Sequence, residues 1–158
     1  LDSLSCFELA VEGGPVVPHG DIRYPDDPDL DLALIELRQP LDGVMPLRMG
    51  SRYELLDEVV VLGYPPIPMS REAHLVANRG EVSSDITLSG HRAMIVSCLL
   101  RGGNSGGPVL NRRGQVIGVV SRNLVNPLSA EEIDLTQGLG FAAALSPDWI
   151  CHKLSARK

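Results

Sequence analysis

Residues 102–108 read Gly-Gly-Asn-Ser-Gly-Gly-Pro, and the apolar pair Val109-Leu110 follows them. Glycine has no Cβ, so such a loop can adopt backbone angles closed to other residues and lets a ligand approach the main chain. Successive N–H groups in it can converge on a developing negative charge. Ser105 lies at the centre of the loop, where a nucleophile for acyl transfer would be placed. The alternative is a glycine-rich hairpin loop with an incidental serine.

The segment from Gly103 to Pro108 resembles the nucleophile loop of trypsin-like (chymotrypsin-fold) serine proteases, in the form common in bacterial Deg/Htr-type enzymes. The resemblance implies peptide-bond hydrolysis through an acyl-enzyme on Ser105, with the N–H groups of Gly103 and Ser105 forming the oxyanion hole. Asn104 stands where digestive relatives carry an aspartate that binds a newly cut N-terminus. Activation by that ion pair is therefore not expected.

The same residues also satisfy the G-x-S-x-G elbow of α/β-hydrolases, in which an acid and a histidine follow the serine. Asp134 or Asp148, and then His152, would supply that order. The elbow requires a helix directly after the serine, and Gly106-Gly107-Pro108 is a poor helix start. The residues over 107–120 indicate a strand, a polar turn and a second strand, which favours a hairpin.

A nearly continuous apolar run over 30–37 carries an aspartate, Asp31, near its start. Such a run suits a strand buried on both faces, where a carboxylate needs hydrogen-bonded partners. The run resembles the segment that carries the family's catalytic aspartate, which implies that Asp31 would accept the Nδ1–H of the catalytic histidine. Asp27 and Asp29 belong to the polar turn before it and are expected to be solvated.

The catalytic histidine has no clear candidate. In the family it precedes the aspartate by about 30–45 residues, which by resemblance places it upstream of residue 1. His19 has the right order but lies only twelve residues before Asp31. Three explanations stay open: an absent N-terminal piece carries the histidine, the protein is a pseudoprotease that binds peptides without cutting them, or an unusual first lobe places His19 productively. We favour the first, because Ser105, Asp31 and the oxyanion glycines are retained. Without the base, this segment alone is expected to be nearly inactive, with a turnover lowered by a factor of about 10⁶.

The resemblance also implies five substrate-binding residues on three segments. They are Leu99, Ser121, Arg122, Asn123 and Ala142. The stretch 116–123 resembles the family strand that pairs with an extended peptide, and 138–142 resembles the wall of the primary specificity pocket. Leu99 stands where trypsin-type enzymes hold an aspartate. We therefore expect a preference for small or medium aliphatic side chains over Lys or Arg.

Composition narrows the classes of function. The 158 residues are 44% apolar and include 16 glycines and 12 prolines, which indicates a buried core made of short strands and turns. The formal net charge of −6, without a basic cluster, argues against nucleic acid as a partner. The three cysteines are odd in number and widely spaced, which predicts buried thiols rather than disulfides or a metal site: Cys6, Cys98 and Cys151.

No cofactor is implied, and no signal peptide or membrane-spanning run occurs in this sequence, so membrane insertion is not expected and no compartment is assigned. The expected partner is a polypeptide substrate in extended conformation. An N-terminal segment or fused domain outside this sequence is a further partner to consider.

The expected fold is all-β: two six-stranded antiparallel β-barrels of the chymotrypsin fold, the first N-terminally incomplete, with a C-terminal helix. The expected division is a partial first barrel over 1–50, a second barrel over 51–145, and a helix and tail over 146–158. The strands expected for the second barrel are 58–65, 73–83, 92–98, 107–110, 115–122 and 137–144. Ser146 and Pro147 suit the N-cap and first turn of the helix.

Overall fold

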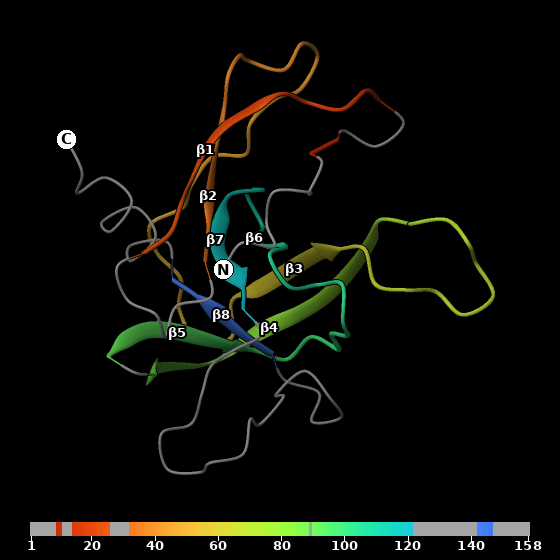
Figure 1. Ribbon diagram of the computed structural model, residues 1–158. Helices are drawn as coiled ribbons and strands as arrows, with labels where there is room; N and C mark the ends of the chain where they lie inside the picture. The colour runs from red at the N-terminus through yellow and green to blue at the C-terminus, as the bar shows by residue number, and fades with distance from the viewer. Residues whose placement is uncertain (1–8, 11–13, 26–31, 89, 122–141, 147–158) are drawn as a thin grey trace, which may run out of the picture.

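The fold is built from β-strands (Figure 1). The computed structural model describes residues 9–10, 14–25, 32–88, 90–121 and 142–146, and these ranges contain eight strands and no helix. The strands are β1 (His19–Arg23), β2 (Leu34–Leu37), β3 (Glu58–Gly63), β4 (Val76–Leu88), β5 (His91–Val96), β6 (Pro108–Asn111), β7 (Val116–Val120) and β8 (Ala142–Leu145). The predicted all-β fold class is confirmed.

The C-terminal helix and tail are expected over 146–158, and all of these residues except Ser146 lie outside the described residues. The described residues form no helix with the length and apolar character needed to cross a membrane.

Six of the strands close into a barrel in the order β3-β4-β5-β8-β7-β6. All neighbouring pairs are antiparallel. Closure pairs both edges of every strand, which removes the open edges that an isolated sheet would present. Each of the six strand ranges expected for the second barrel overlaps one of these strands.

The interior of the barrel is filled by aliphatic side chains that alternate along the strands. In β3, Val59 and Val61 are buried, whereas the residues next to them in the strand are only partly buried. Met94 from β5 and Ile117 from β7 belong to the same cluster. Burying a side chain of this size contributes about 1.5–3 kcal/mol relative to leaving it in water. The barrel is therefore a firm support for the loops at its ends.

β1 and β2 form a separate two-stranded ribbon, in which Ile22 lies opposite Ile35. The expectation that the run 30–37 is buried on both faces is wrong for its described part, since Leu37 is 38% exposed. The physical reason is that β2 has β1 as its only hydrogen-bonded neighbour among the described strands. A ribbon of two strands has little stability on its own. The division of the chain at residues 50 and 145 stays a prediction.

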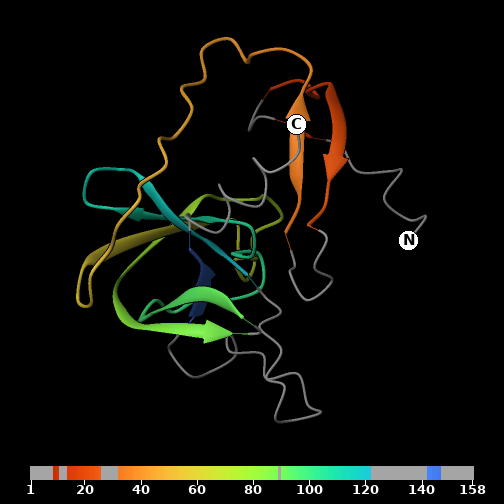
Figure 2. The same ribbon diagram turned by 90° about the vertical axis from the view of Figure 1, so that its left-hand side faces the viewer.

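Residues 38–57 link the ribbon to the barrel and are tied to the barrel surface (Figure 2, orange to yellow). The Gly50 N–H donates to the Val116 carbonyl at the start of β7, with an N···O distance of 2.8 Å. Farther along, the Tyr53 hydroxyl donates to the Asp85 carboxylate on β4 at 2.9 Å. The link thus lies against the barrel before it enters β3.

Candidate functional site

The long connections between barrel strands gather at one end of the barrel. Because neighbouring strands are antiparallel, β3, β5 and β7 end where β4, β6 and β8 begin. We call this end the barrel mouth; it is marked by the last residues of those three strands, Gly63, Val96 and Val120. The connection between β3 and β4 and the connection between β5 and β6 both lie here. Ser105 belongs to the second of these.

Residues 97–107, which we call the serine loop, cross the barrel mouth. The loop leaves β5, whose neighbours are β4 and β8, and enters β6, whose neighbours are β3 and β7. β5 and β6 therefore lie on opposite walls of the barrel. The serine loop divides the mouth into a β3–β4 side and a β7–β8 side.

Hydrogen bonds attach the serine loop to both of these sides. On the β3–β4 side, the Tyr64 N–H donates to the Gly103 carbonyl at 3.0 Å, and on the β7–β8 side the Gly106 N–H donates to the Val120 carbonyl at 2.8 Å. Position 103 requires glycine, because its φ is +96° and a Cβ there would lie 2.5 Å from the Tyr64 oxygen. The glycines of the motif thus allow the close approach that fixes the loop.

Two tight turns shape the loop around Ser105. The Asn104 N–H donates to the Arg101 carbonyl at 3.1 Å, and the Gly107 N–H donates to the Asn104 carbonyl at 2.9 Å. Ser105 itself is exposed. Within the described part of the chain, the N–H groups of Gly103 and Ser105 donate no backbone hydrogen bond. Both N–H groups are therefore free of the backbone bonds that hold the rest of the loop.

Asn104 is buried beneath the serine loop and is 1% exposed. Its Nδ2 donates to the Arg101 carbonyl at 2.9 Å, while its Oδ1 has no hydrogen-bond partner among the described residues. A Cβ at Gly63 would lie 2.5 Å from that Oδ1, so the amide packs directly on the end of β3. A neutral amide costs less to bury at such a place than a carboxylate would.

The structure describes some of the residues proposed for catalysis and substrate binding but not all. It places Gly103 and Ser105 together on the serine loop at the barrel mouth. Asp31, Arg122 and Asn123 lie outside the described residues, so their positions stay predictions.

The remaining predicted substrate-binding residues lie on two different parts of the mouth. Ser121 directly follows β7 and is 6% exposed, and Ala142 begins β8, in register with Val96 of β5. Both therefore lie on the β7–β8 side. Leu99 belongs to the serine loop itself and is 60% exposed.

The histidines of the described residues are dispersed. His19 lies in β1, and His91 begins β5 at the barrel end opposite the mouth. His74 lies in the connection between β3 and β4, where its Nε2 is 2.8 Å from the Ser70 Oγ. His152 is outside the described residues. The structure thus adds no candidate for the general base.

Cys98 is a buried thiol, as the spacing of the cysteines predicts. Burial raises its pKa to about 11, and its Sγ donates to the Asn78 carbonyl at 3.7 Å. The thiol is therefore protonated near neutral pH, and a protonated thiol is a poor nucleophile. Cys6 and Cys151 lie outside the described residues.

A pocket on the β3–β4 side of the mouth is absent from the sequence-based prediction. Its volume is about 300 Å³, and we call it the β3–β4 pocket. It is lined by Pro65, Pro66, Ile67, Pro68, Val76, Asn78, Leu99, Arg101 and Asn104. The one sequence signal that points to it is the proline-rich run 65–68, which follows β3 directly. The serine loop supplies the opposite wall.

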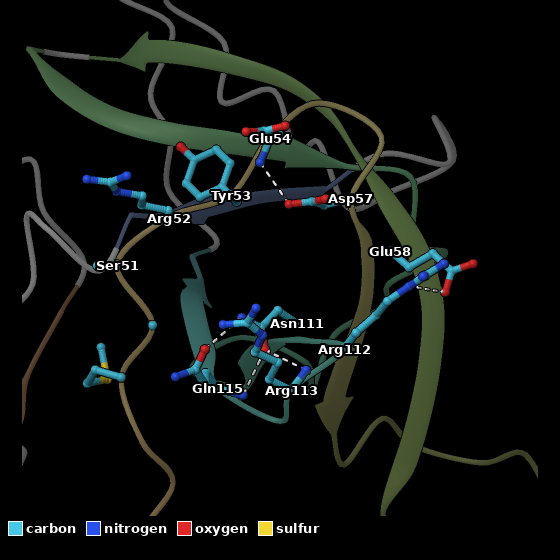
Figure 3. A pocket seen from close by; sticks show the side chains of 12 residues that line it. Ser51, Arg52, Tyr53, Glu54, Asp57, Glu58, Asn111, Arg112, Arg113 and Gln115 are labelled. Atoms are coloured by element: carbon cyan, nitrogen blue, oxygen red, sulfur yellow. Dashed lines mark hydrogen bonds and ion pairs between the residues drawn. The ribbon is translucent and has the colours of Figure 1, made fainter.

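A larger cavity, of about 500 Å³, lies away from the mouth, between residues 49–58 and the turn that joins β6 to β7 (Figure 3). Its polar groups largely bind one another: Arg112 donates to Glu58 at 2.9 Å, and Asn111 donates to Gln115 at 3.2 Å. The Arg112 guanidinium, together with that of Arg79, holds the pKa of Glu58 below its usual value. The barrel mouth, which carries the serine loop, remains the candidate site.

Comparison with known proteins identifies the family and the fold of the chain. A family model described as "Trypsin-like peptidase domain" matches residues 8–119. The chain is 33% identical over 133 residues to the putative protease Do-like 14 of Arabidopsis thaliana, covering 82% of this chain and 28% of that protein. It is 36% identical over 98 residues to the chloroplastic protease Do-like 2 of the same plant, covering 59% of this chain and 16% of that protein. The chain spans less than a third of the length of the curated relatives it matches.

Solved structures share the fold. The active form of the Rv3671c protease from M. tuberculosis superimposes with a TM-score of 0.67 at 22% identity, covering 90% of this chain and 60% of that one. The HtrA-type protease AlgW, solved with a decapeptide, gives a TM-score of 0.68 at 16% identity, covering 93% of this chain and 42% of that one.

Proposed function

Because the chain belongs to the trypsin-like peptidase family, we propose that it is a serine endopeptidase that forms an acyl-enzyme on Ser105. The observation that carries the proposal is the serine loop. Ser105 is exposed on a loop that is hydrogen-bonded to both sides of the barrel mouth. Two N–H groups of this loop, those of Gly103 and Ser105, donate no backbone hydrogen bond within the described residues. Paired donors next to a serine hydroxyl are what a developing oxyanion requires.

In the proposed reaction, the Ser105 hydroxyl attacks the carbonyl carbon of the scissile bond and gives its proton to a histidine. The N–H groups of Gly103 and Ser105 hold the oxyanion of the tetrahedral intermediate. The histidine then protonates the leaving amine, and the acyl group stays on Ser105. Water repeats the sequence on the acyl-enzyme and releases the acid. Asp31 accepts the histidine Nδ1–H and fixes its tautomer.

We place the part of the substrate before the scissile bond on the β7–β8 side. Ser121, Arg122 and Asn123 would offer main-chain partners to an extended peptide, and Ala142 would contact the side chain that enters the primary specificity pocket. Leu99, the other residue predicted for that pocket, lies on the serine loop and lines the β3–β4 pocket. The adjacent positions of Ser121 after β7 and Ala142 at the start of β8 support this arrangement. The pocket would prefer small or medium aliphatic side chains.

The proposal requires a general base. His91 begins β5, at the end of the barrel opposite Ser105, and His19 lies on the β1–β2 ribbon. His74 lies in the β3–β4 connection, where its Nε2 is within hydrogen-bond distance of the Ser70 Oγ. We therefore propose that the histidine comes from a segment that precedes residue 1, as the family order of base, acid and nucleophile suggests.

A fluorophosphonate probe, which reacts with an activated serine, tests the proposal on the full-length protein. We expect labelling of the wild type and none of Ser105→Ala, whereas the exposed and distant Ser51→Ala variant should label like the wild type. Labelling that survives the Ser105→Ala substitution would assign the reactive serine elsewhere.

The second candidate function is that of a peptide-binding module without hydrolytic activity. It is favoured because none of the described histidines is assigned as the general base. Full-length protein that stays unlabelled and yet binds an extended peptide would establish this alternative.

A further inference from the structure

We propose that the β3–β4 pocket binds an apolar side chain on the leaving-group side of the scissile bond, and that Arg101 binds a carboxylate next to it. The inference rests on the proposed function for the direction in which a substrate crosses Ser105. It goes beyond that function by naming a second specificity pocket and the chemistry that the pocket selects.

The position of the pocket follows from the way the serine loop divides the barrel mouth. If the substrate before the scissile bond lies along Ser121 on the β7–β8 side, an extended chain that passes over Ser105 continues onto the β3–β4 side. Gly103 marks the crossing, because a Cβ there would lie 2.8 Å from the Pro65 Cα. Pro65 is also part of the pocket wall. The predicted oxyanion donor thus packs against one residue of the pocket wall.

The wall of the β3–β4 pocket is mostly apolar. Six of the nine described residues that line it are proline or aliphatic, and a volume of about 300 Å³ matches the lower range of ligand sites. Ile67 is 40% exposed and Leu99 is 60% exposed, so an entering side chain would cover apolar surface that now faces water. The prolines have a fixed φ, which limits the ordering that binding requires.

Arg101 gives the pocket a single charge. Among the described residues of the lining it is the only ionisable one, it is exposed, and it forms no ion pair with another described residue. Its backbone carbonyl accepts hydrogen bonds from the Asn104 N–H and Nδ2, which fixes the main chain from which the side chain extends. A guanidinium binds a carboxylate through two parallel hydrogen bonds. The carboxylate can come from an acidic side chain or from the C-terminus of a peptide.

Peptides that share one acyl-side sequence test the inference on the full-length protein. On the leaving-group side, Leu or Ser is scanned through the first three positions and followed by Asp or Lys with an amidated end. A further peptide ends in a free carboxylate instead of Asp, which separates the two sources of the charge. Binding is measured with the Ser105→Ala variant by fluorescence anisotropy, and cleavage is measured with the wild type. We expect Leu to be preferred over Ser by about tenfold at one position, and Asp over Lys by a ratio that falls with added salt.

Matched variants connect these preferences to the pocket. Ile67→Ser should abolish the preference for Leu, whereas Met69→Ser, at a fully exposed position of the same connection outside the pocket, should preserve it. Arg101→Gln should abolish the preference for a carboxylate, whereas Arg71→Gln, also outside the pocket, should preserve it.

The outcomes separate this inference from the proposed function. Leu-dependent binding that Ile67→Ser removes, without cleavage by the wild type, would support the pocket and overturn the hydrolysis. Cleavage with a flat leaving-group profile, or with equal effects of Ile67→Ser and Met69→Ser, would overturn the pocket and leave the hydrolysis intact. Neither binding nor cleavage of any peptide would overturn both.

Discussion

Gly63, the last residue of β3, and Asn104, the residue before the candidate nucleophile, are in direct contact. A Cβ at position 63 would lie 2.5 Å from the Asn104 Oδ1 and 2.9 Å from its Cα. Both residues are buried. The contact lies where the serine loop packs on the barrel. The position of Ser105 therefore depends on the absence of a side chain at Gly63.

A methyl group at Gly63 should therefore disturb the candidate nucleophile. We expect Gly63→Ala to lower the free energy of unfolding by about 1–3 kcal/mol, because the backbone of Asn104 cannot yield without strain. Labelling of Ser105 by the fluorophosphonate probe should slow by at least about tenfold, which is the rate effect of 1.4 kcal/mol. Gly102→Ala is the matched control, since a Cβ there meets no atom within 4 Å. Equal behaviour of the two variants would show that the contact does not position the serine.

Asn104→Asp should be destabilising in a pH-dependent way. The Nδ2 that donates to the Arg101 carbonyl would be replaced by an oxygen, and a buried carboxylate would be left without a donor. We expect a loss of about 1–3 kcal/mol near neutral pH. Burial raises the pKa of the new carboxyl group in the folded state, so the loss is full above that pKa and disappears as the pH falls toward the unfolded value. Urea denaturation at several pH values measures it. A penalty that is independent of pH, as expected for Asn104→Ala, would contradict the burial of a charge.

Tyr53 should ionise at a higher pH than an ordinary tyrosine. Burial and the hydrogen bond to Asp85 raise its pKa to about 12, against the opposing effect of Arg92. The raised pKa in the folded state means that this contribution to stability is full below the unfolded pKa of 10.0 and is lost as the pH rises from there toward 12. A tyrosinate absorbance titration should show a late transition that Tyr53→Phe removes. Persistence of the late transition in that variant would assign it to another tyrosine.

Cys98 should resist alkylation in the folded protein. Its pKa of about 11 leaves little thiolate at mildly alkaline pH, and the side chain is fully buried against Gly80. We expect site-resolved mass spectrometry to show Cys98 unmodified by iodoacetamide in buffer and fully modified in urea. Modification of Cys98 in buffer at the rate of a free thiol would contradict its burial.

The sequence predicts local features of the barrel well because strand periodicity and turn residues are local. β3, for example, is expected over 58–65 and ends at Gly63, where Tyr64 turns to bind the serine loop. β4 is expected over 73–83 but continues to Leu88. The extension comes from its partner: β4 stays paired with β5 as far as His91, and Gly90 at a φ of +80° closes the turn.

Features formed by residues that are far apart in the sequence could not be predicted from the sequence alone. The β3–β4 pocket joins Pro65, Asn78 and Leu99, which come together only when the barrel closes. The exposure of β2 could not be predicted for the same reason, because the apolar run that contains β2 does not indicate how many strands pair with it. Asp31 remains a prediction because it lies outside the described residues.

Barrel closure also decides where another protein chain can join this one through a shared sheet. All six barrel strands have hydrogen-bonded neighbours on both edges, so in the described part of the chain the unpaired strand edges belong to the β1–β2 ribbon. Recruitment of a partner by strand addition would therefore take place at the ribbon and leave the barrel that carries Ser105 undisturbed. An interface formed by strand addition at the ribbon would leave the hydrogen bonds between the barrel strands unchanged.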